Sequence, residues 1–527
     1  MTGKKAVLPS VPVDQGAVGT AGRGVSAHAA SGADRPALVV GDRVRTYGEL
    51  DDRARRLAAV LADMGAGPGH PVASVLRNGF EPFEVATAAA MAGAAYLPVN
   101  WHLKANELAY LLGDAGVGAV VGHTDMDPVL REAMGRAGID GPPLLADVAG
   151  ADEVVAEGDY EARIADAVAD PSLSSGPGPE LVFYTSGTTA RPKGVVHGGL
   201  GDPAARQAGM EGQSMLWGWT PDDVYLMSGP AYHAAHAGWA LTALYVGATT
   251  VVPERFDARE FLRGVERFRA TRSFMVPAHF IRILEVPEDE RRLIDVSTLS
   301  LVVHGGAPCP VAIKRRMMEA FPLTEIHELY GASEGGATRI SPQEWRERPG
   351  SVGRPWPGVE IRVLADDGTP VPAGVDGVIW IRPPGSQRFT YRNDPDATEA
   401  AWREDAFSVG DIGHLDADGY LTITDRVSDM VLWGGVNIAP REIEEVLYLH
   451  PAVVDCAVFG VPHERDGEQL KAMVEVRSPV SVDDLADHVR RHLADYKVPR
   501  EWAIVDELPR DPNGKVLKRL LRAGPGS

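Results

Sequence analysis

The alternation of apolar and polar positions predicts a folded chain built from short buried strands, turns and an amphipathic helix. An apolar run over 181–184 follows the turn-rich segment PSLSSGPGPE, which indicates a strand that carries a polar loop at its end. A second buried strand is predicted over 301–303, and the segment DADGY predicts a hairpin turn over 416–420. Pro440 stands at the first turn of a predicted helix whose apolar residues, through Leu447, share one face.

Two stretches resemble membrane or targeting segments on first reading. The uncharged run Val224–Pro253 is long, but proline, histidine and glycine residues interrupt it, so we expect a buried strand–loop–helix passage rather than a membrane span. Residues 1–33 are rich in Gly, Ala and Val without a periodic apolar face, and we expect a mobile tail. Prolines and Asp14 interrupt the apolar core that a secretion signal needs, so we expect a cytoplasmic protein.

Composition and charge narrow the class of protein. At 527 residues and 44% hydrophobic content, the chain is long enough for two or more domains. Its net charge of −21 argues against a nucleic-acid binder, because sequence-independent binding to a phosphate backbone needs a basic surface. The two cysteines, Cys309 and Cys456, form no CxxC motif, so we expect inert core residues in a reducing compartment and no cysteine-built metal site.

The polar loop after the first predicted strand carries the first candidate chemistry. In TSGTTARPKG, Gly187 allows the backbone to approach a ligand closely, and Lys193 adds a point charge. Such a loop can wrap phosphates, although Pro192 and Gly194 exclude a Walker loop. For the loop taken alone, a solvated surface turn remains the alternative. Its hydroxyl donors are Thr185, Ser186, Thr188 and Thr189.

Two further segments suit a nucleotide and a metal ion. Gly305 and Gly306 follow the strand predicted over 301–303 and would let a flat ring such as adenine lie against the backbone, although such a pair alone is more typical of a turn at a strand end. In HELYGASEGG, Glu334 is the candidate metal ligand, because magnesium is a hard cation that selects carboxylate and phosphate oxygens. A solvated glutamate is the alternative.

Several ordered motifs together resemble the adenylate-forming superfamily of acyl-CoA synthetases, luciferases and peptide-synthetase adenylation domains. The resemblance covers Asp34 to Arg522 and implies an α/β (mixed α+β) fold. It implies a large N-terminal domain over 34–426, made of two α/β subdomains and a small β-barrel-like subdomain, and a small mobile α+β C-terminal domain over 427–527. The motifs that carry the resemblance are RTYGELDDRARRLAAVLADMGAGPG, AAYLPVNWHLKANELAYLL, YTSGTTARPKG, ELYGASEGG, VGDIGHLDADGYLTITDRVSDMVLWGGVNIAPREIEEVL and LPRDPNGKVLKR.

The resemblance implies roles for single residues of these motifs. Asp411 would bond both ribose hydroxyls, and Arg426 would reach ribose and phosphate. Lys515 would enter the active site for adenylation, where its charge stabilises the carboxylate oxygen and the phosphate. Ser428 would be the hinge about which the C-terminal domain turns. The expected catalytic residues are Lys515, Lys193, Glu334 and His233, and the expected magnesium ligands are Glu334 and Thr188.

Further contacts with the nucleotide and the thiol are implied in the same way. Gly434 and Gly435 would lie along the tunnel of the pantetheine group, and the hydroxyl of Ser333 would touch a phosphate. The other expected nucleotide contacts are Gly305, Gly306, Ala307, Tyr330 and Gly331, together with Thr185, Ser186, Gly187, Thr188, Thr189 and Lys193.

The segment GPAYHAAHAGWA is expected to line the pocket for the acid. The resemblance places an aromatic residue or a histidine as a gate, here Tyr232 and His233, with His236 and Trp239 deeper and Gly331 nearby. Amino-acid-activating relatives usually carry an aspartate after the aromatic residue, whereas alanines follow here. An acid with an uncharged aliphatic or aromatic tail therefore fits best.

The resemblance favours an ATP-dependent acid:CoA ligase that uses ATP, magnesium and CoA and forms an acyl-adenylate with release of pyrophosphate and then AMP. One alternative keeps adenylation but uses a carrier-protein thiol, an amine or an oxyacid such as nitrite. A different class, a non-catalytic nucleotide-binding regulator, is suggested by Ala190 and Val409, which depart from the family pattern. Oligomeric state stays open, a homodimer included.

Overall fold

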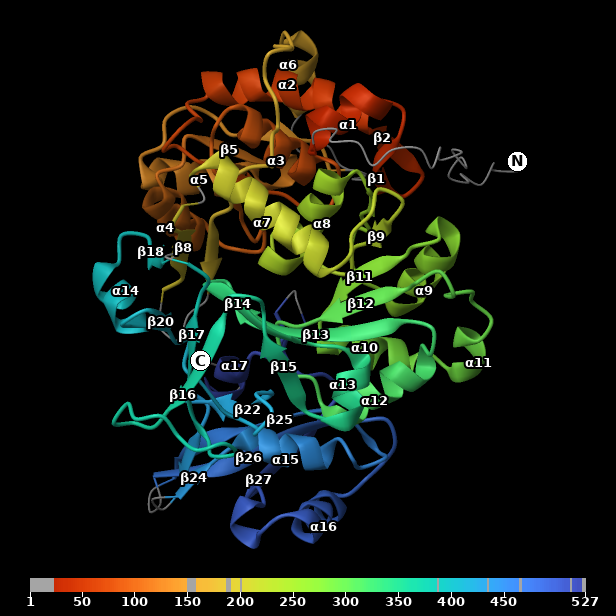
Figure 1. The fold of residues 1–527 in the computed structure, drawn as a ribbon, viewed down its shortest axis with the longest axis vertical. Helices are drawn as coiled ribbons and strands as arrows, with labels where there is room; N and C mark the ends of the chain where they lie inside the picture. Colours follow the sequence, from red (N-terminus) through yellow and green to blue (C-terminus); the bar gives the residue numbers. More distant parts are fainter. Residues whose placement is uncertain are drawn as a thin grey trace. The chain divides into compact units, whose positions relative to one another are not determined.

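The computed structural model describes residues 23–148, 158–185, 191–199, 201–385, 388–433, 436–463, 467–511 and 514–523. The chain forms two compact units. Unit 1 comprises Met1–Phe274 and Gln387–Thr398, and unit 2 comprises Met275–Ser386 and Glu399–Ser527. Figure 1 traces the chain through both units.

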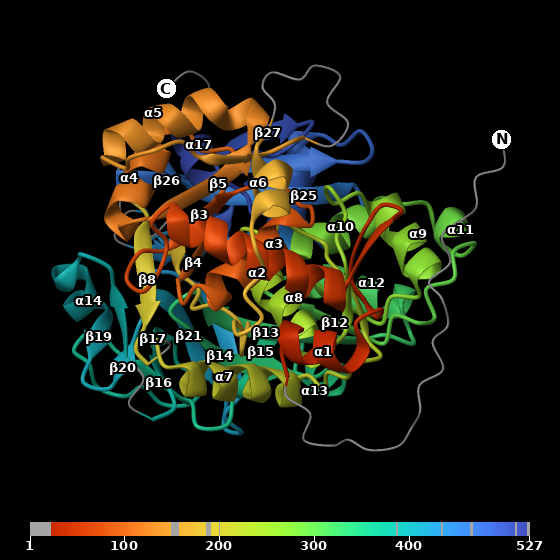
Figure 2. The same cartoon turned by 90° about the horizontal axis from the view of Figure 1, so that it is seen from above.

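A parallel four-stranded sheet forms the first core of unit 1. Its strand order is β4-β3-β5-β6, and side chains of β5 alternate between its two faces. Val121 packs in the cluster that contains α2 and α3, whereas Val120 packs in the cluster that contains α4 and α5. Within each pair the two helices lie side by side, as Figures 1 and 2 show for α4 and α5. The strands are β3 (Val72–Val75), β4 (Tyr96–Pro98), β5 (Ala119–His123) and β6 (Leu144–Ala146), and the helices are α2 (Tyr47–Asp63), α3 (Glu81–Met91), α4 (Ala105–Ala115) and α5 (Asp127–Ala137).

Two further sheets complete unit 1. One has the order β11-β9-β10-β1-β2, with β2 antiparallel to β1, and the other is the antiparallel β18-β8-β7. Their strands are β1 (Pro36–Val40), β2 (Arg43–Thr46), β7 (Phe183–Thr185), β8 (Lys193–His197), β9 (Val224–Leu226), β10 (Thr249–Val251), β11 (Arg272–Met275) and β18 (Phe389–Tyr391). The remaining helices that begin in this unit are α1 (Val25–Gly32), α6 (Tyr160–Asp166), α7 (Pro203–Leu216), α8 (Ala234–Val246), α9 (Ala258–Phe268) and α14 (Pro395–Ala401).

Helix α1 corrects the prediction of a mobile tail over residues 1–33. Val25 and His28 of this helix are buried, and the Nε2 atom of His28 lies 3.0 Å from the carbonyl oxygen of Tyr245. The helix is therefore part of the folded unit, and residues 1–22 lie outside the described part of the chain.

The uncharged run Val224–Pro253 folds as predicted into a strand–loop–helix passage. It contains β9, α8 and β10, and most residues of α8 are buried within unit 1. No helix in the described ranges combines the length and the apolar character that a membrane crossing requires.

Unit 2 begins with a parallel pair of strands and continues antiparallel. Helix α12 connects β12 to the parallel strand β13, and a hairpin leads into β14. The order within the unit is β19-β20-β17-β21-β22-β15-β14-β13-β12, with β16 paired to β17. The strands are β12 (Leu301–His304), β13 (Glu325–Ala332), β14 (Gly335–Ile340), β15 (Ser351–Pro355), β16 (Glu360–Leu364), β17 (Gly377–Arg382), β19 (Trp402–Arg403), β20 (Ala406–Phe407), β21 (Asp411–Leu415) and β22 (Leu421–Arg426), and the helices are α10 (Pro277–Glu285), α11 (Glu288–Arg291), α12 (Val311–Ala320) and α13 (Pro342–Glu347).

A second sheet of unit 2 lies near the C-terminus and has the order β24-β23-β26-β25, with β27 paired to β26. Helices α15 and α16 contribute to the hydrophobic cluster on this sheet, in which Ile443 and Leu447 are fully buried. The helix predicted from Pro440 is thereby confirmed. The elements are β23 (Val431–Trp433), β24 (Val436–Ile438), α15 (Pro440–Leu447), β25 (Val453–His463), β26 (Gly467–Val476), α16 (Val482–His492), β27 (Glu501–Val505) and α17 (Lys518–Ala523).

The predicted fold class is confirmed. Parallel and antiparallel strands with helices form the long N-terminal part of the chain, and a small α+β region follows at its C-terminal end. The strands predicted over 181–184 and 301–303 correspond to β7 and β12, and the hairpin turn over 416–420 joins β21 to β22. The predicted boundary at residue 426 falls inside unit 2 and stays a prediction.

Candidate active site

Three residues predicted to contact a nucleotide meet in unit 2. The hydroxyl of Tyr330 donates to Oδ2 of Asp411 at 2.7 Å, and Nε of Arg426 donates to Oδ1 of the same carboxylate at 2.7 Å. The antiparallel register of β21 and β22 sets Asp411 opposite Arg426, and Asp411 is only 3% exposed. Because each carboxylate oxygen has more than one lone pair, Asp411 retains capacity to accept from a further hydroxyl.

The charges of this cluster follow from its burial. Burial, reinforced by the neighbouring carboxylate of Asp411, raises the pKa of Tyr330, so its hydroxyl stays protonated and remains a donor. Burial alone would lower the pKa of Arg426, but Asp411 outweighs this effect and raises it. The cluster is therefore one buried carboxylate held by a neutral donor and a cation.

Lys515 extends from a tight hairpin at the C-terminal end of unit 2. Its backbone N–H donates to Oδ1 of Asp511 at 2.9 Å, and Gly514 adopts φ +84°, where other side chains are strained. The residue is exposed, but loss of hydration around its ammonium group and the nearby charge of Arg426 lower the pKa of Lys515. Three carboxylates oppose this effect, Asp511 most strongly and Asp411 least. Lys515 thus shares the electrostatic environment of the Tyr330–Asp411–Arg426 cluster.

The residues around the predicted metal ligand form a close-packed hairpin. Ser333 and Glu334 are the two residues between the paired Ala332 and Gly335. A Cβ atom on Gly331 would lie 2.8 Å from the Cα of Gly336, so the backbone here requires glycine whatever the ligand. Ser333 and Glu334 are both half-buried at this hairpin tip.

The side chains at this hairpin fit a magnesium ion only when the ion is bound together with a nucleotide. No group of three or more His, Cys, Asp or Glu side chains suited to a metal ion occurs within the described ranges. Magnesium in nucleotide sites is commonly held by one or two carboxylates together with substrate phosphates. Glu334 alone therefore fits a magnesium ion that arrives with a nucleotide, and does not fit an all-protein metal centre. The other predicted ligand, Thr188, lies outside the described residues.

Gly305, Gly306 and Ala307 follow β12. A Cβ atom on Gly305 would lie 2.8 Å from the carbonyl oxygen of Leu329, and Gly306 adopts φ +80°. Close approach of backbone and a left-handed conformation explain both glycines without a ligand. Their contact with an adenine ring stays a prediction.

The phosphate-loop prediction can be placed only in part. Thr185 and Lys193 pair directly across β7 and β8, and Nζ of Lys193 lies 4.8 Å from the ring centre of Tyr391 in unit 1. The strand that carries the loop is held by Asp114, which accepts from the hydroxyl of Tyr184 at 2.6 Å. Five residues of the loop, Ser186, Gly187, Thr188, Thr189 and Ala190, lie outside the described part of the chain.

The predicted acid-pocket residues of unit 1 lie at and within α8. Burial lowers the pKa of His233 and of His236 to about 3, so both imidazoles are neutral near pH 7. His233 follows the buried Tyr232, and its Nε2 atom has no hydrogen-bond partner within the described residues. A buried polar atom without a partner is suited to a hydrogen bond from a ligand.

Trp239 packs within an aromatic cluster. Its ring centre lies 5.6 Å from that of Trp217, 5.5 Å from that of Trp219 and 5.7 Å from that of Phe274. With 3% of its surface exposed, Trp239 is a core side chain of α8. Contact between Trp239 and an acid stays a prediction.

The remaining predicted residues concern the turn of the C-terminal domain. Ser428 is exposed in the turn that follows β22, where the N–H of Asp429 donates to the carbonyl oxygen of Arg426 at 3.0 Å. Gly434 and Gly435 lie outside the described residues.

Sequence reasoning missed two contacts of α12. Nζ of Lys314 lies 2.7 Å from Oε2 of Glu328, and the backbone N–H of Val311 donates to Oε2 of Glu445 at 3.1 Å. Lys314 and Glu328 are 14 positions apart, so no local sequence pattern indicates that they form a pair. A lysine on the apolar side of α12, near Ile313 and Met317, is the one signal that could have indicated the first contact.

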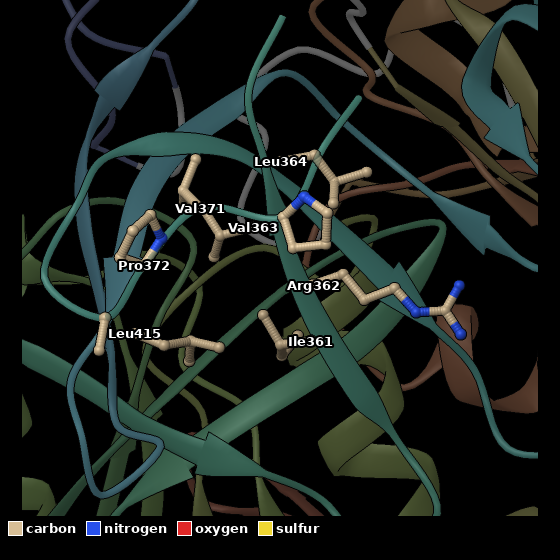
Figure 3. Close-up of a pocket in the computed structure, with 9 residues that line it drawn as sticks. Ile361, Arg362, Val363, Leu364, Val371, Pro372 and Leu415 are labelled. Carbon is tan, nitrogen blue, oxygen red and sulfur yellow. The ribbon is translucent and has the colours of Figure 1, made fainter. Parts of the chain in front are cut away.

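A pocket of about 350 Å³ in unit 2 is separate from these residues. Figure 3 shows its lining from β16, the following loop and the end of β21. None of the predicted site residues lines it. The lining residues are Ile361, Arg362, Val363, Leu364, Pro370, Val371, Pro372, Ala373 and Leu415.

Comparisons with known proteins identify related sequences along most of the chain. The family model of the AMP-binding enzyme matches residues 25–388, and the model of the AMP-binding enzyme C-terminal domain matches residues 442–515. The fatty acid–acyl-carrier-protein ligase ScoC from Streptomyces coeruleorubidus is 31% identical over 510 residues, covering 94% of this chain and 95% of that protein. A feruloyl-CoA synthase from Amycolatopsis sp. is 34% identical over 491 residues, covering 92% of this chain and 94% of that protein.

Solved structures show the same relationship. ATP-bound MatB from Rhodopseudomonas palustris matches with a TM-score of 0.82 and 28% identity, covering 95% of this chain and 98% of that chain. These matches confirm the prediction of an adenylate-forming enzyme of the acid–thiol ligase type. Because one family model spans residues 25–388, more than half of the 527 residues, the chain belongs to the AMP-binding enzyme family.

Proposed function

We propose that the protein is an ATP-dependent acid:CoA ligase acting through an acyl-adenylate on an acid with an uncharged tail. The observation that carries this proposal is the Tyr330–Asp411–Arg426 cluster with Lys515 in its electrostatic field. In this assignment Asp411 accepts from the ribose hydroxyls, and Arg426 and Lys515 bring positive charge to the phosphate side. ATP in the solved structure of MatB supports a nucleotide at a related site.

The reaction proceeds in two displacements without a covalent enzyme intermediate. A carboxylate oxygen of the acid attacks the α-phosphorus of ATP. The bond between the α-phosphorus and the oxygen that bridges it to the β-phosphorus breaks, and pyrophosphate leaves. The sulfur of CoA then attacks the acyl carbon, its proton passes to solvent, and AMP leaves with the electron pair of the acyl–oxygen bond. Positioning and charge stabilisation supply the catalysis. Magnesium, held by Glu334 and the phosphates, would neutralise phosphate charge, with Thr188 as the other predicted ligand.

Neutral surroundings at α8 support the uncharged acid. His233 and His236 carry no charge near pH 7, and the adjacent residues 234 and 235 are alanines. An ammonium or a second carboxylate on the tail would lose hydration there without an opposite charge. We assign His233 to a hydrogen bond with the acid, because its Nε2 atom lacks a partner in the described part of the chain.

Relatives of this chain differ in the acceptor of the acyl group. One relative, matched over 491 residues, is named a feruloyl-CoA synthase, whereas ScoC, matched over 510 residues, is named a fatty acid–acyl-carrier-protein ligase. A carrier-protein thiol is therefore the second candidate. We retain the turn at Ser428 as the hinge between a domain over 34–426 and a domain over 427–527, and a reducing, cytoplasmic setting that suits two buried free cysteines.

One experiment tests both the activity and the acceptor. A panel of aliphatic and aromatic acids is incubated with ATP, with and without magnesium, and pyrophosphate release is measured separately from loss of the CoA thiol. We expect magnesium-dependent release with uncharged acids and matching thiol loss. Pyrophosphate release without thiol loss would select the carrier-protein acceptor, and no release with any acid would contradict the proposed function.

A further inference from the structure

A buried ion pair joins α12 to β13 in unit 2. Nζ of Lys314 lies 2.7 Å from Oε2 of Glu328, with the lysine side chain 0% and the glutamate side chain 7% exposed. The ring centre of Trp345 lies 4.8 Å from the same ammonium group. Charges without access to water are costly to bury, and apolar replacement of such pairs is often no less stable. Stability alone therefore does not explain the pair.

The pair lies where β12 and β13 lead into the segments that are predicted to contact the nucleotide. Glu328 faces His304 in the parallel register of β12 and β13, and Nε2 of His304 lies 3.5 Å from the carboxylate oxygen that contacts Lys314. Gly305 follows His304 directly, and Tyr330 stands two residues after Glu328. One ion pair thus touches the last residue of β12 and the approach to the Tyr330–Asp411–Arg426 cluster.

We propose that Lys314 and Glu328 are positioning residues for the nucleotide. Their ion pair holds α12 against β13 and keeps the Glu328 carboxylate beside His304 at the end of β12, and thereby supports the placement of the Gly305–Gly306 turn relative to the Tyr330 hydroxyl. The inference rests on the proposed function, because it requires ATP to contact both segments. Neither side chain touches the nucleotide in this proposal.

The test measures ATP affinity by direct titration in the absence of acid. Lys314→Met should raise the Kd for ATP at least tenfold and the KM for ATP in parallel, while the KM for the acid changes less than twofold. In the double variant Lys314→Met with Glu328→Gln, no buried charge is left unpaired. This variant should regain the melting temperature of the wild type but keep the weakened ATP affinity, a separation that a purely stabilising pair would not produce.

A matched control is available in unit 1. Arg53 donates from Nε to Oε1 of the fully buried Glu84 at 2.7 Å, and Nε of Arg45 lies 3.2 Å from the same oxygen, so Arg53→Met removes one of two cations from a buried carboxylate. It should lower the melting temperature without altering the Kd for ATP. Wild-type ATP affinity in the double variant, or an equal loss of affinity in Arg53→Met, would overturn the inference while leaving the proposed function intact. If the wild type neither binds ATP nor releases pyrophosphate with any acid, both fail.

Discussion

At the scale of single residues, Asp411 and Lys515 differ in what holds them. Asp411 is buried and held by hydrogen bonds from Tyr330 and Arg426, whereas Lys515 is exposed and its backbone N–H donates to Asp511. A residue held like Asp411 keeps one position and can bind a substrate group throughout the reaction. A residue held like Lys515 can approach and leave with its segment, so the two can serve different steps.

Replacement of Lys515 should therefore affect one half-reaction only. Lys515→Ala removes a positive charge from the phosphate side, and losses of about a hundredfold or more are typical when such a stabiliser is removed. We expect pyrophosphate release to fall by that factor. Chemically made acyl-adenylate plus CoA should still give thioester at a rate close to that of the wild type.

The control for this prediction is Lys471→Ala. Lys471 is also a lysine of unit 2, and it forms an ion pair with Glu501 at 3.2 Å. Pyrophosphate release by this variant should match the wild type. Failure of Lys515→Ala with the acyl-adenylate as severely as with acid and ATP would show that the lysine is not confined to adenylation.

The neutral histidines at α8, His233 and His236, predict how stability depends on pH. Burial lowers the pKa of His233 and of His236 from 6.5 to about 3, so the unfolded chain binds more protons in this range. The stability that these neutral residues contribute is present above about pH 6.5 and is lost as the pH falls toward 3. Each histidine adds at most about 1.4 kcal/mol per pH unit to the slope of the free energy of unfolding.

Urea titrations at pH 7.5 and pH 5 measure this slope. The variant His236→Gln keeps a polar side chain but removes one titrating group, so it should lose less of its free energy of unfolding between the two pH values than the wild type. An unchanged difference between the two pH values would contradict the assignment of a neutral His236.

At the scale of elements, α8 combines predicted pocket residues with core residues. His236 and Trp239 are three residues apart on one helix, and both rings contact Phe274, at 5.4 Å and 5.7 Å between ring centres. Replacing either residue therefore changes the packing of α8 as well as any ligand contact. Effects on the choice of acid must be separated from effects on stability.

The substitution Trp239→Ala should first act on the core. Truncating a buried Trp typically costs about 3–5 kcal/mol, because the neighbouring rings do not fill the cavity. We expect a lower melting temperature and, where the protein stays folded, a shift in the ranking of acids by chain bulk. An unaltered ranking in a folded variant would make Trp239 a core residue only, and unaltered stability would contradict the packing described above.

Local pattern predicted the elements whose apolar residues are close in sequence. The strand at 301–303 and the helix from Pro440 were predictable because β12 is buried throughout and because α15 buries one face. Helix α1 was not predictable, since residues 25–32 are mostly small and the helix is held by contacts such as that of His28 with Tyr245, 217 positions away. The Lys314–Glu328 pair was not predictable for the same reason, because only the fold brings α12 onto β13.

At the scale of the whole molecule, the order of motifs predicted the family although several single motifs were ambiguous. Gly305 and Gly306 satisfy backbone requirements of their own, and Glu334 alone is compatible with a solvated turn. Six ordered motifs in one chain, from RTYGEL to LPRDPNGKVLKR, together indicated an adenylate-forming enzyme. The acid could not be predicted, because none of these motifs specifies the side chains that contact its tail.

Binding of ATP should stabilise the folded molecule as a whole. A ligand at a hundred times its Kd adds about 2.7 kcal/mol to the free energy of unfolding, provided that it binds only the folded state. We expect ATP to raise the melting temperature of the wild type and to have little effect on Asp411→Ala, which lacks the ribose acceptor. Equal ATP-induced shifts in both proteins would contradict the role of Asp411.

Helix α12 is held at two points, at its first N–H by the carboxylate of Glu445 from α15 and at its buried face by Glu328 from β13. A helix is a stiff element, so a displacement at one of these points is felt at the other. If Lys314 and Glu328 position the nucleotide as proposed, ATP binding is coupled to the contact of α12 with Glu445 of α15, and because thermodynamic coupling is reciprocal each strengthens the other by the same factor. Loss of the nucleotide as AMP would then loosen α15 by the same free energy, and departure of α15 would in turn help the spent nucleotide to dissociate.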